Sequence, residues 1–246
     1  MTKNFNGSRV PAVEFLDRGA FIEKMNDHLK IKATSTAVIT IDLHRGHVDP
    51  SVATLPLPKE KAERVVSATA ALLELARTSG MSVIHVILSK RSVEALNPTP
   101  HRRAVLATKQ SILAEGTGDL LSHNLTGSVQ TELHPLLGPV AGDHVIDSKK
   151  AFSGFFGTDL DHLLRVLGVD TVLLAGVNTN TCVLNTAFDA YNLGYTTVVV
   201  SDCVESMYGE DLHYLALQNI SQCVGWVLSL EALSRKVDHK GSPRRD

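Results

Sequence analysis

The chain has 246 residues, of which 43% are hydrophobic and 20% charged, and its formal net charge is -2. This composition is typical of a globular protein, and the length suits one large domain or at most two small ones. The near-zero net charge argues against nucleic acid or an anionic membrane as a partner. No apolar run approaches the roughly 18 residues that cross a bilayer.

The cysteines indicate neither a disulfide framework nor a structural zinc site. Only Cys182, Cys203 and Cys223 are present, and no CxxC pair occurs. Reduced thiols are typical of the cytoplasm, and residues 1–7 lack the apolar core of a secretory signal, so we expect a cytoplasmic protein. We expect Cys203 and Cys223 to be packing residues, because free cysteine is among the most buried residue types.

The first half of the chain is predicted to contain two buried strands separated by a helix. The apolar runs over 36–41 and 81–88 are typical of strands buried on both faces. Residues 57–77 between them carry apolar side chains at helical spacing, with Gly80 as a stop signal.

Residues 89–139 are irregular, apart from a short helix predicted at 104–113. They contain proline, glycine and histidine but show little periodicity. We expect this insertion to cover the functional site and, together with the turn at 42–47, to set its specificity.

Strands and helices alternate again after the insertion. The expected strands are 144–147, 171–175 and 195–200, the expected helices are 160–167, 183–190 and 211–217, and residues 223–228 fit either type. Alternation of buried strands with helices predicts an α/β fold. We expect a three-layer α/β/α arrangement with a mostly parallel, Rossmann-like central sheet.

The elements divide the chain into one domain and two flanking segments. We expect the domain over 35–235, after a polar N-terminal extension over 1–34 that holds a short helix at 20–29. The charged residues 236–246 are expected to form a fraying tail.

Three reactive side chains fall at the carboxyl ends of predicted strands, where parallel α/β sheets place their sites. Asp42 ends the first strand, Lys149 follows the third, and Cys182 follows the fourth. An aspartate within hydrogen-bond reach of a thiol can take its proton, and a nearby lysine favours the thiolate. Each residue alone also fits an ordinary role, with Asp42 as a turn or capping residue and Lys149 as a solvated charge.

Cys182 lies in a turn between a predicted strand and a predicted helix. Unpaired N–H groups and the helix dipole favour negative charge at a helix start, so this position predicts a thiolate nucleophile. The polar residues 178–181 before it can fix an irregular backbone through local hydrogen bonds. A buried, unreactive cysteine is the alternative.

The motifs around these residues resemble the isochorismatase-like cysteine hydrolases over roughly residues 35–230. The motifs are Asp42 after its strand, Lys149-x-x-x-Ser153-x-Phe155-x-x-Thr158-x-Leu160, and Gly176-x-x-Thr179-x-x-Cys182-Val183. The family forms dimers or tetramers, which implies a homodimer or homotetramer here. The segment 153–158 is similar to the corresponding segment of ureidoacrylate amidohydrolases. The presence of Cys182 favours the amidohydrolase branch of the family.

The resemblance implies a cofactor-free Asp-Lys-Cys triad that hydrolyses amide-type C–N bonds through a thioester. Its substrate would be a small amide or ureide. Cys182 would attack the carbonyl, Asp42 would act as general base and acid, and Lys149 would be their electrostatic partner. The resemblance also implies a cis peptide between Val177 and Asn178, and an oxyanion hole formed by the backbone N–H groups of Asn178 and Cys182.

The turn after Asp42 departs from the family pattern. Many members read Asp-x-Gln-x-x-Phe here, whereas this chain has His44 and His47 at the Gln and Phe positions, with Arg45 between them. We predict that these three residues and Phe155 bind substrate, because such side chains can bind a carboxylate, carbonyl or ureido oxygen. Two alternatives stay open. One is a metal-dependent, nicotinamidase-like hydrolase that uses the histidines, although no metal site is assigned. The other is a catalytically silent binding protein on the same fold.

Overall fold

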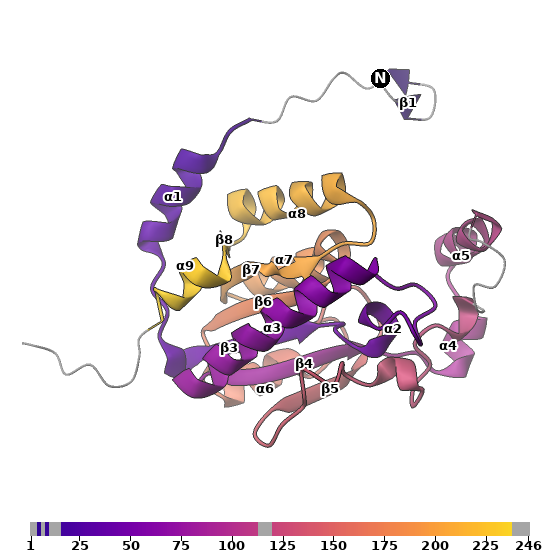
Figure 1. Cartoon of the computed structure of the whole chain (residues 1–246), viewed down its shortest axis with the longest axis horizontal. Coiled ribbons are helices and arrows are strands. Elements are labelled where there is room, and N and C mark those ends of the chain that lie inside the picture. The colour runs from indigo at the N-terminus through magenta and orange to yellow at the C-terminus, as the bar shows by residue number, and fades with distance from the viewer. Residues whose placement is uncertain (1–3, 6–7, 10–15, 113–119, 238–246) are drawn as a thin grey trace, which may run out of the picture.

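A six-stranded parallel sheet forms the centre of the protein (Figure 1). The computed structural model describes residues 4–5, 8–9, 16–112 and 120–237. The strand order is β5-β4-β3-β6-β7-β8, and every neighbouring pair is parallel. The strands are β3 (Thr36–Ile41), β4 (Ser82–Leu88), β5 (His144–Lys149), β6 (Thr171–Val177), β7 (Thr196–Glu205) and β8 (Trp226–Leu228). A separate two-stranded pair is formed by β1 (Asn4–Phe5) and β2 (Ser8–Arg9).

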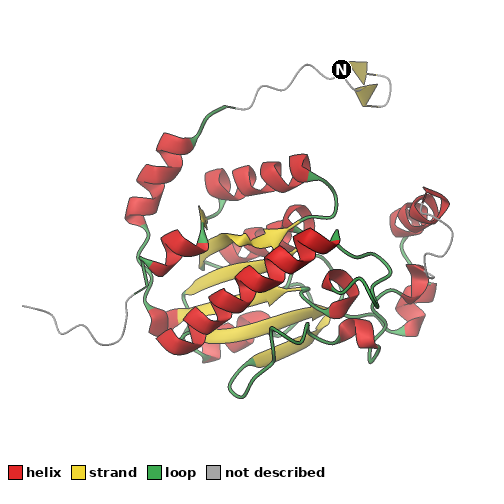
Figure 2. Cartoon of the chain, viewed as in Figure 1, coloured by secondary structure: helices red, strands yellow, loops and turns green. Residues whose placement is uncertain are grey.

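Helices cover both faces of the sheet, which confirms the three-layer α/β/α prediction (Figure 2). One face packs against α3 (Lys59–Ser79) and α9 (Leu230–Ser234), and the other against α6 (Leu160–Val166), α7 (Leu184–Asn192) and α8 (Glu210–Cys223). Successive residues of a strand point to opposite faces, so Val38 joins the core on the α3 side and Ile39 joins the other core. Both residues are fully buried, as a continuous apolar run predicts.

The strand order reverses direction between β3 and β6. The chain steps from β3 through β4 to β5, then crosses over to β6 and continues outward to β7 and β8. The segments that follow β3 and β6 therefore diverge at the carboxyl edge of the sheet and leave a crevice there. Asp42 follows β3, and Asn178 follows β6, so this crevice receives the predicted reactive residues.

Gly176 allows β6 to approach β3 closely just before that crevice. Its φ is 128°, and a Cβ at this position would lie 2.0 Å from the carbonyl oxygen of Ile41. A side chain is thus excluded by both conformation and space. Because Ile41 directly precedes Asp42, this contact helps to fix where the aspartate lies.

The packed structure extends beyond the predicted domain limits at both ends. The N-terminal helix α1 (Gly19–His28) contacts β8, and the Trp226 indole donates a hydrogen bond to the Met25 carbonyl at 2.8 Å. Ile31 and Val237 pair in an isolated parallel bridge, and both are buried. Residues that the sequence assigned to an extension and a tail therefore complete the edge of the fold.

The insertion contains more helix than the sequence predicts. Two helices, α4 (Ser92–Leu96) and α5 (Pro100–Ile112), occupy it, and α5 begins four residues before the predicted 104–113 helix. Proline is well placed at the first turn of a helix, where its missing N–H costs nothing. The described residues also form several short helical segments along the chain, which are α2 (Arg45–Val48), η1 (Ala33–Ser35), η2 (Leu120–Ser122), η3 (Val129–Thr131) and η4 (Thr179–Val183).

The two remaining cysteines differ in their exposure. Cys203 is fully buried in the core on the α3 side, as expected. Cys223 ends α8 and is exposed, so the prediction that it packs in the interior is wrong. The run 223–228 contains both a helix end and a strand, and periodicity alone does not separate them.

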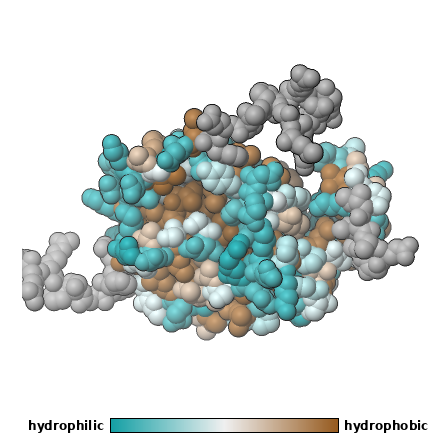
Figure 3. All heavy atoms as spheres, turned by 45° about the horizontal axis from the view of Figure 1, so that its top comes forward, coloured by the Kyte–Doolittle hydropathy of each residue, from teal (hydrophilic) through white to brown (hydrophobic). Residues whose placement is uncertain are grey.

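The surface is mixed in polarity. Figure 3 shows a broad area of hydrophobic residues bordered by hydrophilic ones on the face that it presents. Exposed apolar side chains of α8 include Leu212 and Leu215. Within the described ranges of the chain, none of the helices has both the length and the apolar character to cross a membrane.

Candidate active site

Asp42, Lys149 and Cys182 meet in the crevice at the carboxyl edge of the sheet. The Lys149 ammonium donates hydrogen bonds to Asp42 Oδ2 at 2.6 Å and to Cys182 Sγ at 3.4 Å. The thiol is also hydrogen-bonded to Asp42. Lys149 is the last residue of β5, and both it and Asp42 have no exposed surface. The structure therefore brings together the three side chains that the sequence predicted.

Backbone contacts hold Asp42 in a fixed orientation. Its own N–H donates to the Val86 carbonyl at 2.9 Å, and its Oδ1 accepts the Leu88 N–H at 2.8 Å. Its φ of 56° lies in the left-handed region, which turns the chain sharply after β3. One carboxylate oxygen is thus used for positioning, and the other faces Lys149.

Burial and mutual charge determine the protonation of this cluster. Burial raises the pKa of Asp42, but the charge and hydrogen bond of Lys149, together with the neighbouring His44 and His47, outweigh it, and the net result is a pKa below the usual range. Burial lowers the pKa of Lys149, but the charges and hydrogen bonds of Asp42 and Cys182 together outweigh it and raise the pKa overall. Burial and the neighbouring Asp42 raise the pKa of Cys182 to about 12. The resting cluster is an ion pair beside a protonated thiol.

This protonation state corrects the prediction of a thiolate stabilised by a helix start. The helical segment begins with η4, and Asn178 is its N-cap, so Cys182 lies in the first turn, four residues after the cap. N–H groups at a helix start favour negative charge, but burial of Cys182 disfavours a charge on its sulfur and raises its pKa. Ionisation of the thiol therefore requires transfer of its proton to a neighbouring group.

Hydrogen bonds to the segment just after β7 and to α8 fix the polar turn before Cys182. Asn178 Oδ1 accepts the Met207 N–H at 2.9 Å, and Asn180 Oδ1 accepts the Ser206 hydroxyl at 2.7 Å. Thr179 Oγ1 lies 2.8 Å from Nδ1 of a histidine on α8. The Val177–Asn178 peptide is cis, as the family resemblance implied. The polar turn residues thus anchor an irregular backbone, which explains their presence in a buried segment.

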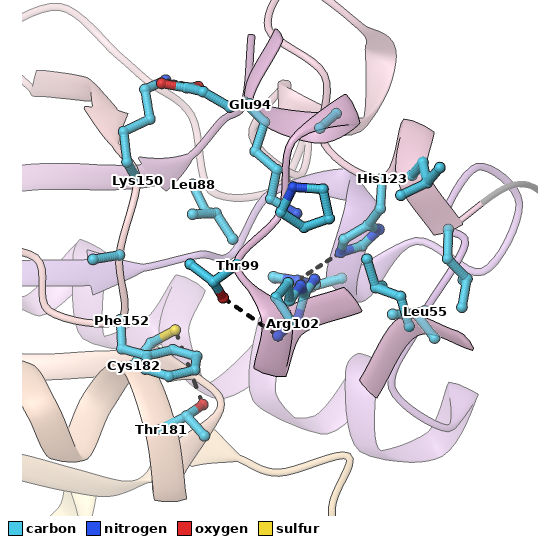
Figure 4. A pocket seen from close by; sticks show the side chains of 18 of the residues that line it. Leu55, Leu88, Glu94, Thr99, Arg102, His123, Lys150, Phe152, Thr181 and Cys182 are labelled. Carbon is cyan, nitrogen blue, oxygen red and sulfur yellow. Dashed lines mark hydrogen bonds and ion pairs between the residues drawn. The ribbon is translucent and has the colours of Figure 1, made fainter. Parts of the chain in front are cut away.

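A cavity of about 510 Å³ lies beside Cys182. Figure 4 shows Cys182, Thr181 and Phe152 together on one side, with Leu55 and His123 on the other. The insertion contributes a large part of the wall, including residues of α4, α5 and η2. The cavity volume falls in the range of small-molecule sites. The insertion therefore lines the site, as the sequence predicted.

The two predicted substrate-binding histidines occupy different positions. His47 lines the cavity, with Nδ1 lying 3.2 Å from the Asp42 carbonyl oxygen and Nε2 lying 3.2 Å from His123 Nε2. His44 is fully buried, and neither of its ring nitrogens has a hydrogen-bond partner among the described residues. Its ring lies beside that of His47, tilted by 31° at a centroid distance of 4.5 Å. We therefore retain only His47 as a candidate substrate contact.

The three imidazoles of this cluster are uncharged at neutral pH. Burial lowers the pKa of His44, His47 and His123, and the value for His123 falls to about 2. Neutral imidazole is the form that binds metals. Among the residues that the structure describes, no group of three or more His, Cys, Asp or Glu side chains is arranged to hold a metal ion.

Arg45 and Phe155 lie away from the cavity, contrary to the prediction that they bind substrate. Arg45 forms ion pairs with Asp49 at 2.9 Å and Glu132 at 3.2 Å. Phe155 packs against the core on the α6 side, with its ring stacked on Tyr195 at a centroid distance of 5.9 Å. Phe152 lines the cavity instead. We replace Phe155 by Phe152 among the candidate contacts.

Sequence reasoning missed several charged and polar residues that line the cavity. Lys90 follows β4, Arg102 lies on α5, His123 follows η2, and Tyr208 follows β7. Lys90 and Tyr208 come within three residues of a strand end, a signal that could have found them. Arg102 and His123 come from the irregular insertion, where no periodic pattern indicates which side chains point inward.

These features define a class: a parallel α/β protein with a buried Asp-Lys-Cys cluster beside a small-molecule cavity. The isochorismatase domain family matches residues 36–232. The chain therefore belongs to the isochorismatase family of hydrolases.

Named relatives lie within this family. The chain is 30% identical over 216 residues to the ureidoacrylate amidohydrolase of Azorhizobium caulinodans, covering 84% of this chain and 92% of that protein. It is 30% identical over 203 residues to the maleamate amidohydrolase of Pseudomonas putida, covering 82% of this chain and 87% of that protein. The solved N-carbamoylsarcosine amidase of Thermoplasma acidophilum superposes with a TM-score of 0.62 and 27% identity, covering 79% and 96% of the two chains.

Proposed function

We propose that this protein hydrolyses an amide-type C–N bond in a small carbamoyl, ureido or carboxamide compound, with Cys182 as the nucleophile. The proposal rests above all on the contact of Cys182 Sγ with the Lys149–Asp42 ion pair, beside a cavity of small-molecule size. It is also supported by three relatives whose names describe hydrolysis of amide or carbamoyl groups.

The first half of the proposed reaction forms a thioester. Asp42 accepts the thiol proton as Sγ attacks the substrate carbonyl, and Lys149 stabilises the negative charge on sulfur during the transfer. The carbonyl electrons move to oxygen, which the backbone N–H groups of Asn178 and Cys182 are proposed to bind. The C–N bond then breaks, and the proton held by Asp42 passes to the departing nitrogen as ammonia or an amine.

The second half returns the enzyme to its starting state. Asp42, again ionised, removes a proton from water as the oxygen attacks the thioester carbonyl. The tetrahedral intermediate expels the sulfur, which regains a proton from Asp42, and the acid product leaves. The raised pKa of Cys182 suits this cycle, because the thiol needs to lose its proton only when a substrate carbonyl is present to accept the attack.

The test compares two cysteine variants across a panel of ureides, carbamates, carboxamides and hydrazides. Wild type is expected to release ammonia from at least one compound, and Cys182→Ala to release it at least about a thousandfold more slowly. Cys223→Ala is the matched control, because this thiol is exposed and ends α8. Circular dichroism checks that each variant folds. Undiminished turnover by Cys182→Ala would overturn the proposal, and chelator-sensitive turnover would favour the metal-dependent alternative.

A further inference from the structure

Glu205 is a buried carboxylate that the proposed reaction does not use. It is the last residue of β7 and is 1% exposed. In the register of the sheet it lies beside Val177, the residue that precedes the polar turn 178–181. A buried charge is costly unless other groups compensate it, so the partners of this carboxylate indicate what it holds together.

Two cations on α3 and one backbone group compensate the charge. Lys61 Nζ donates to Glu205 Oε1 at 3.0 Å, and Arg64 forms an ion pair with Oε2. The Ser206 N–H donates to Oε1 at 2.8 Å. Burial raises the pKa of this carboxylate, but the hydrogen bonds from Ser206 and Lys61, together with the charges of His213 and Lys61, outweigh it and hold the pKa below its usual range. The ionised side chain therefore links α3 to the segment after β7.

The segment after β7 in turn holds the polar turn before the nucleophile. The Ser206 hydroxyl donates to Asn180 Oδ1 at 2.7 Å, and the Met207 N–H donates to Asn178 Oδ1 at 2.9 Å. Two successive hydrogen bonds therefore connect Glu205 to the turn. One joins its carboxylate to the Ser206 N–H, and the other joins the Ser206 hydroxyl to Asn180.

A histidine on α8, the helix on the opposite face of the sheet from α3 (Figure 1), forms a second connection to the turn. His213 Nδ1 lies 4.0 Å from Glu205 Oε1 and 2.8 Å from Thr179 Oγ1. Thr179 has no exposed surface. Lys61 also pairs with Glu210, the first residue of α8, at 2.5 Å. The same cluster of charges therefore fixes both segments that hold the turn.

We propose that Glu205 is a positioning residue for the reaction at Cys182. It acts through Ser206 and His213, which hold the turn that carries the nucleophile. This inference rests on the proposed function, in which the backbone N–H groups of Asn178 and Cys182 bind the oxyanion. A displacement of about 1 Å in such groups can reduce a rate about a hundredfold. Glu205 does not itself line the cavity, so its loss is expected to change kcat more than KM.

The experiment compares Glu205→Met and Glu205→Gln with wild type on the best compound of the ammonia-release panel. Methionine has a similar length but lacks the acceptor oxygens, whereas glutamine keeps one oxygen that can accept the Ser206 N–H. Glu205→Met is expected to lower kcat about ten- to hundredfold and to change KM less than about threefold. Glu205→Gln is expected to recover most of this loss.

Asp143→Asn is the matched control for loss of a buried acid that pairs with α3. The Asp143 side chain is 3% exposed and forms an ion pair with Arg77 at 2.7 Å. It directly precedes β5, so it lies at the amino edge of the sheet, opposite the reactive cluster. Asp143→Asn is expected to lower the melting temperature but to keep kcat within about threefold of wild type. An equal loss of kcat in Asp143→Asn and Glu205→Met would overturn the positioning role.

A second variant covers the case in which Glu205→Met does not fold. Ser206→Ala/His213→Phe removes both side chains that connect the carboxylate to the turn. This double variant is then expected to show the loss of kcat, again with little change in KM. An unchanged kcat in the double variant would overturn the proposal.

Hydrogen exchange separates this inference from the proposed function, because it needs no substrate. Peptides that cover 178–184 are expected to exchange faster in Glu205→Met than in Asp143→Asn. If wild type hydrolyses no compound of the panel, the proposed function fails and this measurement decides. Faster exchange in the turn supports the positioning role, and exchange equal to that of the control overturns it. If wild type is active and Glu205→Met keeps the kcat of the control, the hydrolase stands and the positioning role is overturned.

Discussion

Replacing Lys149 by methionine removes the positive charge from a fully buried ion pair while keeping a side chain of similar length. Lys149 and Asp42 each have no exposed surface, and their charged atoms lie 2.6 Å apart. Removing one partner leaves a buried carboxylate without a counter-charge, which typically costs about 3–5 kcal/mol. For a protein of this size the melting temperature is then expected to fall by about 6–20 °C.

The double variant Lys149→Met/Asp42→Asn separates the charge effect from packing. Asparagine keeps an oxygen that can accept the Leu88 N–H, which Asp42 Oδ1 accepts at 2.8 Å. Neutral replacements of a buried pair are often close to neutral in stability. The double variant is therefore expected to be more stable than the single variant, and the difference measures the coupling between the two residues.

The stability of wild type and of Lys149→Met is expected to change with pH in opposite directions. In wild type the pKa of Asp42 is lowered by folding. The contribution of its ionised carboxylate to the free energy of unfolding is therefore present above the unfolded pKa of about 3.9 and is lost as the pH falls below that value. Without Lys149, burial raises that pKa, so the variant loses stability as the pH rises from about 4. Denaturant unfolding at pH 5 and pH 8 should show a larger deficit at pH 8. A deficit below about 1 kcal/mol at both values would refute the reasoning.

Three further predictions concern other features of the structure. Iodoacetamide at pH 7.5 should modify exposed Cys223 before Cys182, and the Cys182 rate should rise about tenfold per pH unit toward its pKa of about 12. Equal rates by peptide mass spectrometry would contradict this. Gly176→Ala should cost about 3 kcal/mol or more in denaturant unfolding, whereas Gly168→Ala should cost about 1 kcal/mol, because nothing lies within 4 Å of the added Cβ. Trp226→Phe removes the hydrogen bond to Met25 and should cost about 1 kcal/mol. Hydrogen exchange in α1 should then be faster, and unchanged exchange would argue against this anchor.

The centre of the sheet was predictable because β3 and β6 are buried on both faces. Runs such as 36–41 and 171–175 are continuously apolar, and glycine or a polar turn follows them, so their type and approximate limits follow from composition. The three reactive side chains were predictable for a related reason. Asp42 and Cys182 stand beyond such runs, and parallel sheets bring strand ends to one edge.

The surrounding site was less predictable, because it depends on the directions of side chains in irregular backbone. Phe152 and Phe155 lie three positions apart in a segment without helical or strand periodicity, yet one lines the cavity and the other packs on Tyr195. Arg45 is turned away by carboxylates that include Glu132, a residue 87 positions later in the sequence. The pKa of Cys182 also depends on burial, which a position in a turn does not reveal.

The placement of the site at several strand ends has a consequence for folding. Asp42 and Lys149 are 107 positions apart, and Lys149 and Cys182 are 33 apart, so their contacts close long loops. Such distant pairings form slowly compared with local helices. The cluster exists only once β3, β5 and β6 have joined in register through β4. Recovery of activity after dilution from denaturant should therefore follow completion of the sheet rather than formation of the helices.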